Sequence, residues 1–170
     1  MINLPSSVAF LVLPVLFSAG WTLATLAYRD LSLRRLPNGW VAAYAGLFPL
    51  YAWASGMGWA QVGWHAAFGM AAFAFTILLF VLRILGGGDV KLWGAIMLWA
   101  GPQGAASALV MATLCGSLLG VLGWLSRAIL RRKRRPAGAA ILRMLTAARG
   151  VPYGAGLAIA GIHTLVMAGL

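Results

Sequence analysis

Acidic residues are almost absent from this chain. Of its 170 residues only Asp30 and Asp89 are acidic, whereas 13 are Lys or Arg, and the formal net charge is +11. Charged residues make up 9% of the chain and hydrophobic residues 62%, and the mean hydropathy is +0.92. A soluble domain carries more charge than this, so the composition indicates a polytopic membrane protein with a single membrane domain, residues 1–170.

Cysteine occurs once, as Cys115 within an apolar run. A single cysteine excludes both an intramolecular disulfide and a cysteine-based zinc site. Two acids are also few for a divalent metal such as Mg²⁺, which relies on oxygen ligands, and this argues against a metal-dependent lipid-phosphate transferase. The sequence therefore predicts no metal site and no cofactor.

The apolar residues gather in six stretches, so the predicted fold class is all-α with six transmembrane helices. A helix needs about 20 residues to cross the hydrocarbon core. The fourth stretch is shorter than that, which places Asp89 somewhat below the headgroups or thins the bilayer locally. The stretches are residues 8–28, 39–54, 64–85, a short one from 92 to the turn at 101–104, 105–125 and 151–169.

Six crossings would put every Lys and Arg on one side of the membrane. Arg29, Arg34 and Arg35 follow the first stretch, and no basic residue precedes it. The positive-inside rule places that end in the cytoplasm and both chain termini on the outer side. The basic segment 127–150 is then a cytoplasmic loop that contacts anionic lipid headgroups. We prefer this role to nucleic-acid binding, because nothing downstream resembles a soluble binding domain.

Both acids are expected at cytoplasmic helix ends, at similar depth. An ionisable residue at the edge of an apolar segment is costly and is a functional candidate by default. Two carboxyl groups that share a proton can act as aspartic proteases do, with the ionised one activating water. The alternative is two unrelated interfacial acids, with Asp30 beside a nearby Arg and Asp89 as a helix cap. Spacing alone leaves both interpretations open.

Three glycines, residues 86–88, directly precede Asp89. Since glycine has no side chain to keep another backbone away, we expect Gly86 and Gly88 to admit a substrate peptide. For Lys91 we expect that it either holds the fourth helix or contacts a substrate carbonyl. The alternative is that Lys91 has no specific role and that its side chain extends to the membrane–water interface.

Three segments resemble the motifs of a known family. Residues 86–89 fit the G-x-G-D signature of intramembrane aspartyl proteases, and their continuation at 90–92 looks like the type IV prepilin peptidase version. Asp30, followed by Leu-Pro-Asn at 36–38, resembles that family's Asp upstream of Ile-Pro-Asn. Val-Pro-Tyr-Gly-Ala at 151–155 is similar to its Ile-Pro-Tyr-Gly-Pro segment. The resemblance covers almost the whole chain.

The resemblance implies a membrane-embedded aspartic endopeptidase with Asp30 and Asp89 as its catalytic dyad. Such an enzyme removes the basic leader from pilin precursors at the cytoplasmic face of a bacterial inner membrane. The chain resembles in particular the small form that accompanies tight-adherence (Flp) pili. Larger members have an added cytoplasmic region with paired cysteines and methylate the new N-terminus. This chain has neither that added region nor paired cysteines, which implies peptidase activity without methyltransfer. The presenilin branch fits less well, because no Pro-Ala-Leu motif follows.

Two other functions remain as alternatives. A small ion or proton carrier needs polar groups at several depths, but apart from His163 the stretches offer few, and both acids lie on one side. The second alternative is a non-catalytic membrane assembly factor. An activity test is needed to separate an assembly factor from a protease.

Overall fold

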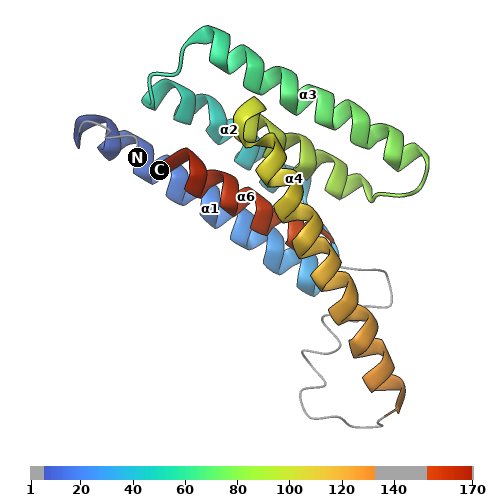
Figure 1. Cartoon of the computed structure of the whole chain (residues 1–170). Coiled ribbons are helices and arrows are strands. Elements are labelled where there is room, and N and C mark those ends of the chain that lie inside the picture. Colours follow the sequence, from blue (N-terminus) through green and yellow to red (C-terminus); the bar gives the residue numbers. More distant parts are fainter. Residues whose placement is uncertain (1–5, 133–152, 170) are drawn as a thin grey trace.

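The part of the chain that the computed structural model describes, residues 6–132 and 153–169, is all-helical (Figure 1). Its helices are α1 (Ser6–Leu33), α2 (Asn38–Ala54), α3 (Trp59–Val81), α4 (Gly87–Arg132) and α6 (Tyr153–Gly169). Three segments are long and apolar enough to cross a membrane, namely Phe10–Leu33, Trp59–Val81 and Gly87–Leu130. The chain is therefore a multi-pass membrane protein. The six crossings and the outer placement of both termini stay predictions.

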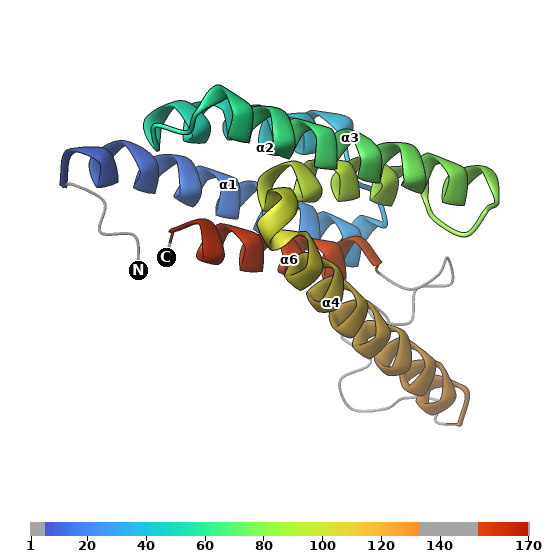
Figure 2. The same cartoon turned by 45° about the horizontal axis from the view of Figure 1, so that its top comes forward.

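Helix α4 is broken at Gly101, within the turn expected from the sequence. Gly101 has φ 57 and ψ −168, and the positive φ suits a residue without a Cβ. The chain turns back at this point, since Tyr153 lies near Asp89 in the first half of α4 and packs on Gly116 in the second. Two helical segments thus meet at a sharp bend (Figures 1 and 2).

His65 of α3 replaces a hydrogen-bond donor that helix α4 lacks at the bend. In an unbroken helix the carbonyl of Leu98 would accept a bond from residue 102, but Pro102 has no N–H. The Nδ1 atom of His65 lies 2.9 Å from that carbonyl oxygen and is assigned as the donor. A Cβ on Gly101 would come within 2.5 Å of the imidazole ring, so only glycine fits beside it.

Helix α6 is largely buried against α1 and both halves of α4 (Figure 2). Its glycines allow close approach. A Cβ on Gly161 would lie 2.9 Å from Leu23 of α1, and one on Gly156 would lie 3.1 Å from the backbone nitrogen of Gly116 in α4. Small residues at such crossings are what membrane helices use to associate. The packing brings the start of α6 to the ends of α1 and α4 that carry the acids.

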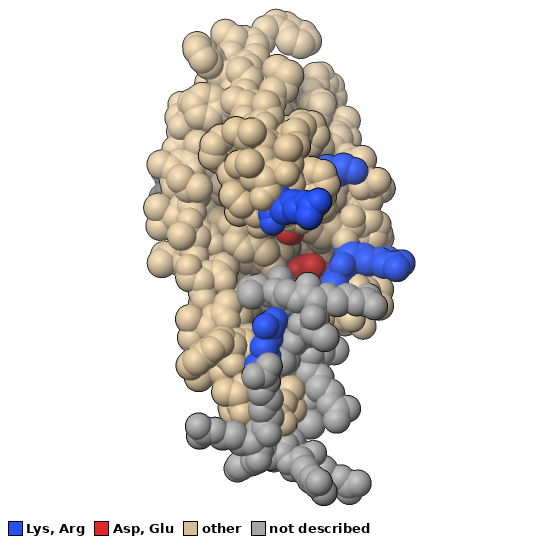
Figure 3. Space-filling model, turned by 90° about the vertical axis from the view of Figure 1, so that its right-hand side faces the viewer, with Lys and Arg blue, Asp and Glu red and all other residues tan. Residues whose placement is uncertain are grey.

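Basic side chains gather at one end of the bundle, which we call the basic end, and Figure 3 shows them around the acidic side chains. The basic end is defined by Arg29, Arg34, Arg83, Lys91 and Arg127.

Several predicted helix boundaries were wrong because hydropathy measures the apolar span and not the helix. α1 continues to Leu33, since no Pro or Gly interrupts it after residue 28, and Asp30 therefore lies inside its last turn. α4 begins at Gly87 instead of residue 92. Its second half continues to Arg132, so residues 127–132 of the expected basic loop are helical. The rest of that loop, 133–150, lies outside the described residues.

The first half of α4 is short for a membrane crossing. From Gly87 to the bend at Gly101 it rises about 21 Å, against a hydrocarbon core of about 30 Å. The expectation of a short fourth helix agrees with this length.

Candidate active site

Asp30 is buried in the last turn of α1, with 7% of its surface exposed. Its Oδ2 accepts a hydrogen bond from the backbone N–H of Ala155 at 3.0 Å, and the N–H of Gly154 is also directed at the carboxyl group. Both amides belong to the first turn of α6, where backbone N–H groups have no partner within the helix. The N-terminus of α6 thus binds this carboxyl group, a position that suits negative charge.

Asp89 lies half-buried in the first turn of α4. The backbone N–H of Gly86 is directed at its carboxyl group, and a Cβ on Gly86 would lie 3.0 Å from its Oδ2. Asp89 is near enough to Asp30 for the two carboxyl groups to interact electrostatically. Figure 3 shows the two acidic side chains close together on one face of the molecule. The structure therefore brings together the two acids that the sequence singled out.

Leu36, in the link between α1 and α2, contacts the starts of both α4 and α6. A Cβ on Gly88 would lie 3.0 Å from the Cβ of Leu36. A Cβ on Gly154 would lie 2.8 Å from Leu36 Cδ1 and 3.0 Å from the Cγ of Asp30. Two glycines thus let Leu36 pack beside the acids. The sequence pointed to Leu36 through its motif, but it gave no sign of these partners.

The two glycines proposed to admit substrate have different surroundings. Gly86 is exposed and faces the carboxyl group of Asp89. Gly88 is partly buried against Leu36, so its missing side chain serves packing between α4 and the link. Admission of a substrate backbone stays a prediction for both.

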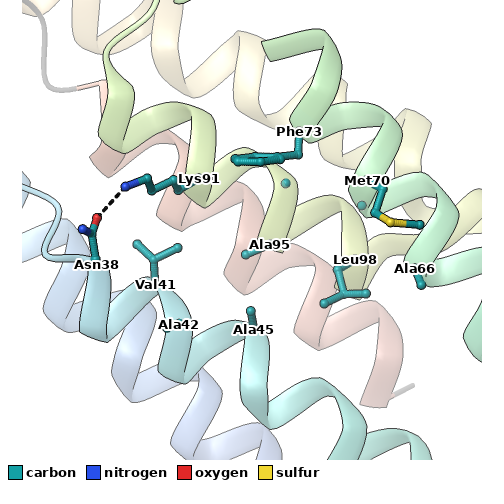
Figure 4. Close-up of a pocket in the computed structure, with 12 residues that line it drawn as sticks. Asn38, Val41, Ala42, Ala45, Ala66, Met70, Phe73, Lys91, Ala95 and Leu98 are labelled. Atoms are coloured by element: carbon teal, nitrogen blue, oxygen red, sulfur yellow. Dashed lines mark hydrogen bonds between the residues drawn. The ribbon is translucent and has the colours of Figure 1, made fainter. Parts of the chain in front are cut away.

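Lys91 holds the start of α4 against the start of α2. Its Nζ donates a hydrogen bond of 3.0 Å to Oδ1 of Asn38 (Figure 4). This is the first of the two roles expected for Lys91, and contact with a substrate carbonyl stays a prediction. The partner, Asn38, belongs to the Leu-Pro-Asn segment that the sequence analysis linked to Asp30.

Two further side chains border the acids. Arg34 directly follows α1, where its φ of 54 closes the helix and its N–H donates to the carbonyl of Asp30 at 3.0 Å. Its guanidinium interacts electrostatically with the Asp30 carboxyl group and with Arg127. Tyr153 packs on Gly116 and lies near Asp89. Asp30 therefore has the basic neighbour that the interpretation as two unrelated acids requires, but it also has Asp89, which that interpretation does not predict.

A comparison with protein families gives this arrangement a context. The model of the type IV leader peptidase family matches residues 17–121 of the chain, a range that includes both acids, the Leu-Pro-Asn segment and the glycines at 86–88. The chain belongs to the type IV leader peptidase family. It matches no curated protein and no solved structure significantly. The matched range ends before α6, so the amides that bind Asp30 are contributed from outside it.

Membership of the leader peptidase family confirms the resemblance and implies prepilin substrates. Within residues 6–132 and 153–169 of this leader peptidase, no three His, Cys, Asp or Glu side chains are grouped as metal ligands. The polar groups gathered at the site are two carboxyl groups, backbone N–H groups and a guanidinium. Two adjacent carboxyl groups can hold a proton between them and accept one from water, which is the chemistry of general acid–base catalysis.

Proposed function

We propose that this leader peptidase is an aspartic endopeptidase and that Asp30 and Asp89 form its catalytic dyad. The observation that carries the proposal is the approach of the chain's two acids to one another at the basic end. Like charges at short distance disfavour double ionisation, so such a pair shares one proton. This charge state supplies one general base and one general acid.

In the proposed reaction the ionised carboxylate takes a proton from water, and the water oxygen attacks the scissile carbonyl carbon. The protonated partner gives its proton to the carbonyl oxygen, so that a tetrahedral diol forms. When the C–N bond breaks, the leaving nitrogen takes a proton from the protonated carboxyl group, and a hydroxyl group of the diol gives its proton to the ionised carboxylate, which restores the shared proton. Because Oδ2 of Asp30 accepts the amide of Ala155, we place the shared proton on another of the carboxyl oxygens.

The proposed substrates are prepilins of tight-adherence pili, cleaved after a glycine at the cytoplasmic face of a bacterial inner membrane. The short first half of α4 supports a cleavage site close to the membrane boundary, because a crossing of this length either leaves Asp89 somewhat below the headgroups or thins the bilayer locally. The exposed Gly86 beside Asp89 supports the approach of a substrate backbone. We further propose that the basic segment 127–150 contacts anionic headgroups and that the enzyme has no methyltransferase activity.

Co-expression with candidate prepilins tests this function. We expect the prepilin to lose its leader, seen as a smaller product, and mass spectrometry of that product to show a new, unmethylated N-terminus after a glycine. If all candidate prepilins remain at full length beside the expressed, membrane-inserted protein, the proposed peptidase function is refuted and a non-catalytic role is favoured. A methylated N-terminus would refute the proposed absence of methyltransfer.

A further inference from the structure

A cavity of about 510 Å³ lies between α2, α3 and α4 (Figure 4). Its wall is apolar except at one end, where Asn38 and Lys91 form their hydrogen bond. The cavity therefore has one charged end, at the basic end of the bundle, and an apolar body. The body is lined in part by Val41 and Ala45 of α2, Met70 and Phe73 of α3, and Ala95 and Leu98 of α4.

Small residues create the cavity and leave it open to the membrane. Helices α3 and α4 are in close contact, since a Cβ on Gly94 would lie 2.9 Å from the Cβ of Phe73. Across the cavity, beyond Asn38, α2 presents Val41 and the short side chains of Ala42 and Ala45. At the rim Met70 is 67% exposed and Phe73 is 39% exposed. An apolar molecule in the bilayer can thus enter from the side.

The cavity is separate from the proposed catalytic dyad. Successive residues of a helix are rotated by about 100°, so Lys91, Ala95 and Leu98 lie on roughly the opposite face of α4 from Asp89. A peptide seated in the cavity would have α4 between its backbone and that carboxyl group. The cavity is therefore unsuited to hold the cleavage site of a substrate.

The length of the cavity also argues against a transmembrane helix as its occupant. Its lining runs from Asn38 to Ala45 and from Lys91 to Leu98, about 10 Å along each helix. A membrane-spanning helix would need a groove of about 30 Å, whereas one leaflet of the hydrocarbon core is about 15 Å deep. The cavity fits a chain that enters from one leaflet.

We propose that this cavity binds an acyl chain of an anionic phospholipid whose phosphate contacts Lys91. The Lys91 ammonium group has three N–H donors, and Asn38 accepts one of them. Lys91 is exposed at the charged end of the cavity, so its other donors are accessible to a phosphate group there. Juxtamembrane lysines attract anionic lipids in this way. The inference does not rest on the proposed protease function.

Native mass spectrometry of the protein released from bilayers that contain phosphatidylglycerol and phosphatidylcholine tests the proposal. The wild type should retain phosphatidylglycerol selectively. Lys91→Gln should reduce this selectivity about fivefold, which corresponds to the ~1 kcal/mol that one lysine contributes at an anionic surface. Ala45→Phe, which fills the cavity, should abolish retention of the lipid.

Matched variants distinguish the cavity from general attraction of lipid to a basic protein. Arg35→Gln removes an exposed cation that does not line the cavity, and Ala43→Phe adds the same bulk to an exposed position of α2. Both should retain lipid as the wild type does. Equal loss from Arg35→Gln and Lys91→Gln, or full retention by Ala45→Phe, would overturn the proposal.

A photoreactive benzoylphenylalanine in place of Met70 identifies the occupant directly. We expect crosslinks to phospholipid in bilayers that also contain a prepilin. Crosslinks to the prepilin or to a second copy of the chain, in place of lipid, would show that a protein segment occupies the cavity and would refute the lipid site.

Discussion

Gly154 is the residue that allows α6 to reach the Asp30 carboxyl group. A side chain there would meet both Asp30 and Leu36 within about 3 Å, and the first-turn amides of α6 would have to withdraw from Asp30. The sequence predicted both acids, because the chain offers no others. The family resemblance singled out the segment 151–155, which contains Gly154. It could not predict the contact of Gly154 with the Asp30 carboxyl group, since no periodic pattern relates the end of α1 to a helix that begins more than a hundred residues later.

We predict that Gly154→Ala lowers the cleavage rate about tenfold to a hundredfold while the protein stays in the membrane, since a shift of 1 Å at a reacting group costs about a hundredfold. The measurement is the initial rate of prepilin cleavage at equal enzyme content. Gly120→Ala is the matched control, because a Cβ at Gly120 meets nothing within 4 Å in the described part of the chain. Wild-type rates for Gly154→Ala would mean that the approach of α6 does not position Asp30.

The bend of α4 depends on its own Gly-Pro pair and on one contact from a distant part of the chain. The Gly-Pro pair predicts a break in the helix from sequence alone, because glycine accepts the positive φ and proline lacks the N–H. The sequence did not predict that His65, from a neighbouring helix, replaces the missing donor. A histidine in an apolar segment has no signature that identifies its acceptor.

We predict that His65→Phe destabilises the fold by about 1–3 kcal/mol, because the ring is kept beside Phe48 but the Leu98 carbonyl loses its hydrogen bond. Thermal unfolding in detergent should show a lower Tm. Gly101→Ala should lower it as well, whereas Gly63→Ala, where a Cβ meets nothing within 4 Å in the described part, should have little effect. An unchanged Tm for His65→Phe would contradict the assigned role.

For the whole molecule, hydropathy predicted the all-helical membrane fold, but it misplaced the ends of α1 and α4. Helix α1 continues past its apolar residues until Arg34, which has a positive φ, ends it, whereas α3 ends at Val81, inside its apolar stretch and just before the positive φ of Arg83. Hydropathy also could not show that α6 is largely buried between α1 and α4, because a helix between other helices and a helix facing lipid are both apolar.

Labelling of single cysteines in a Cys115→Ala background tests the predicted orientation. A reagent that does not cross the membrane should reach cysteines introduced at Gly58 and Gln103 from outside, because the positive-inside rule places the basic end in the cytoplasm. A cysteine in place of Arg132 should react only after the membrane is opened. Reaction of that cysteine from outside would reverse the orientation and the placement of the site.

The central claim is that Asp30 and Asp89 act as one catalytic unit, and cleavage of a processed prepilin by Asp30→Asn and Asp89→Asn tests it most directly. We predict that each variant remains in the membrane and loses activity by at least about 10²–10⁴-fold, the range that general acid–base catalysis contributes. The double variant should be no slower than either single variant, because residues that act as a unit are not additive. Retained cleavage by either single variant would contradict the dyad.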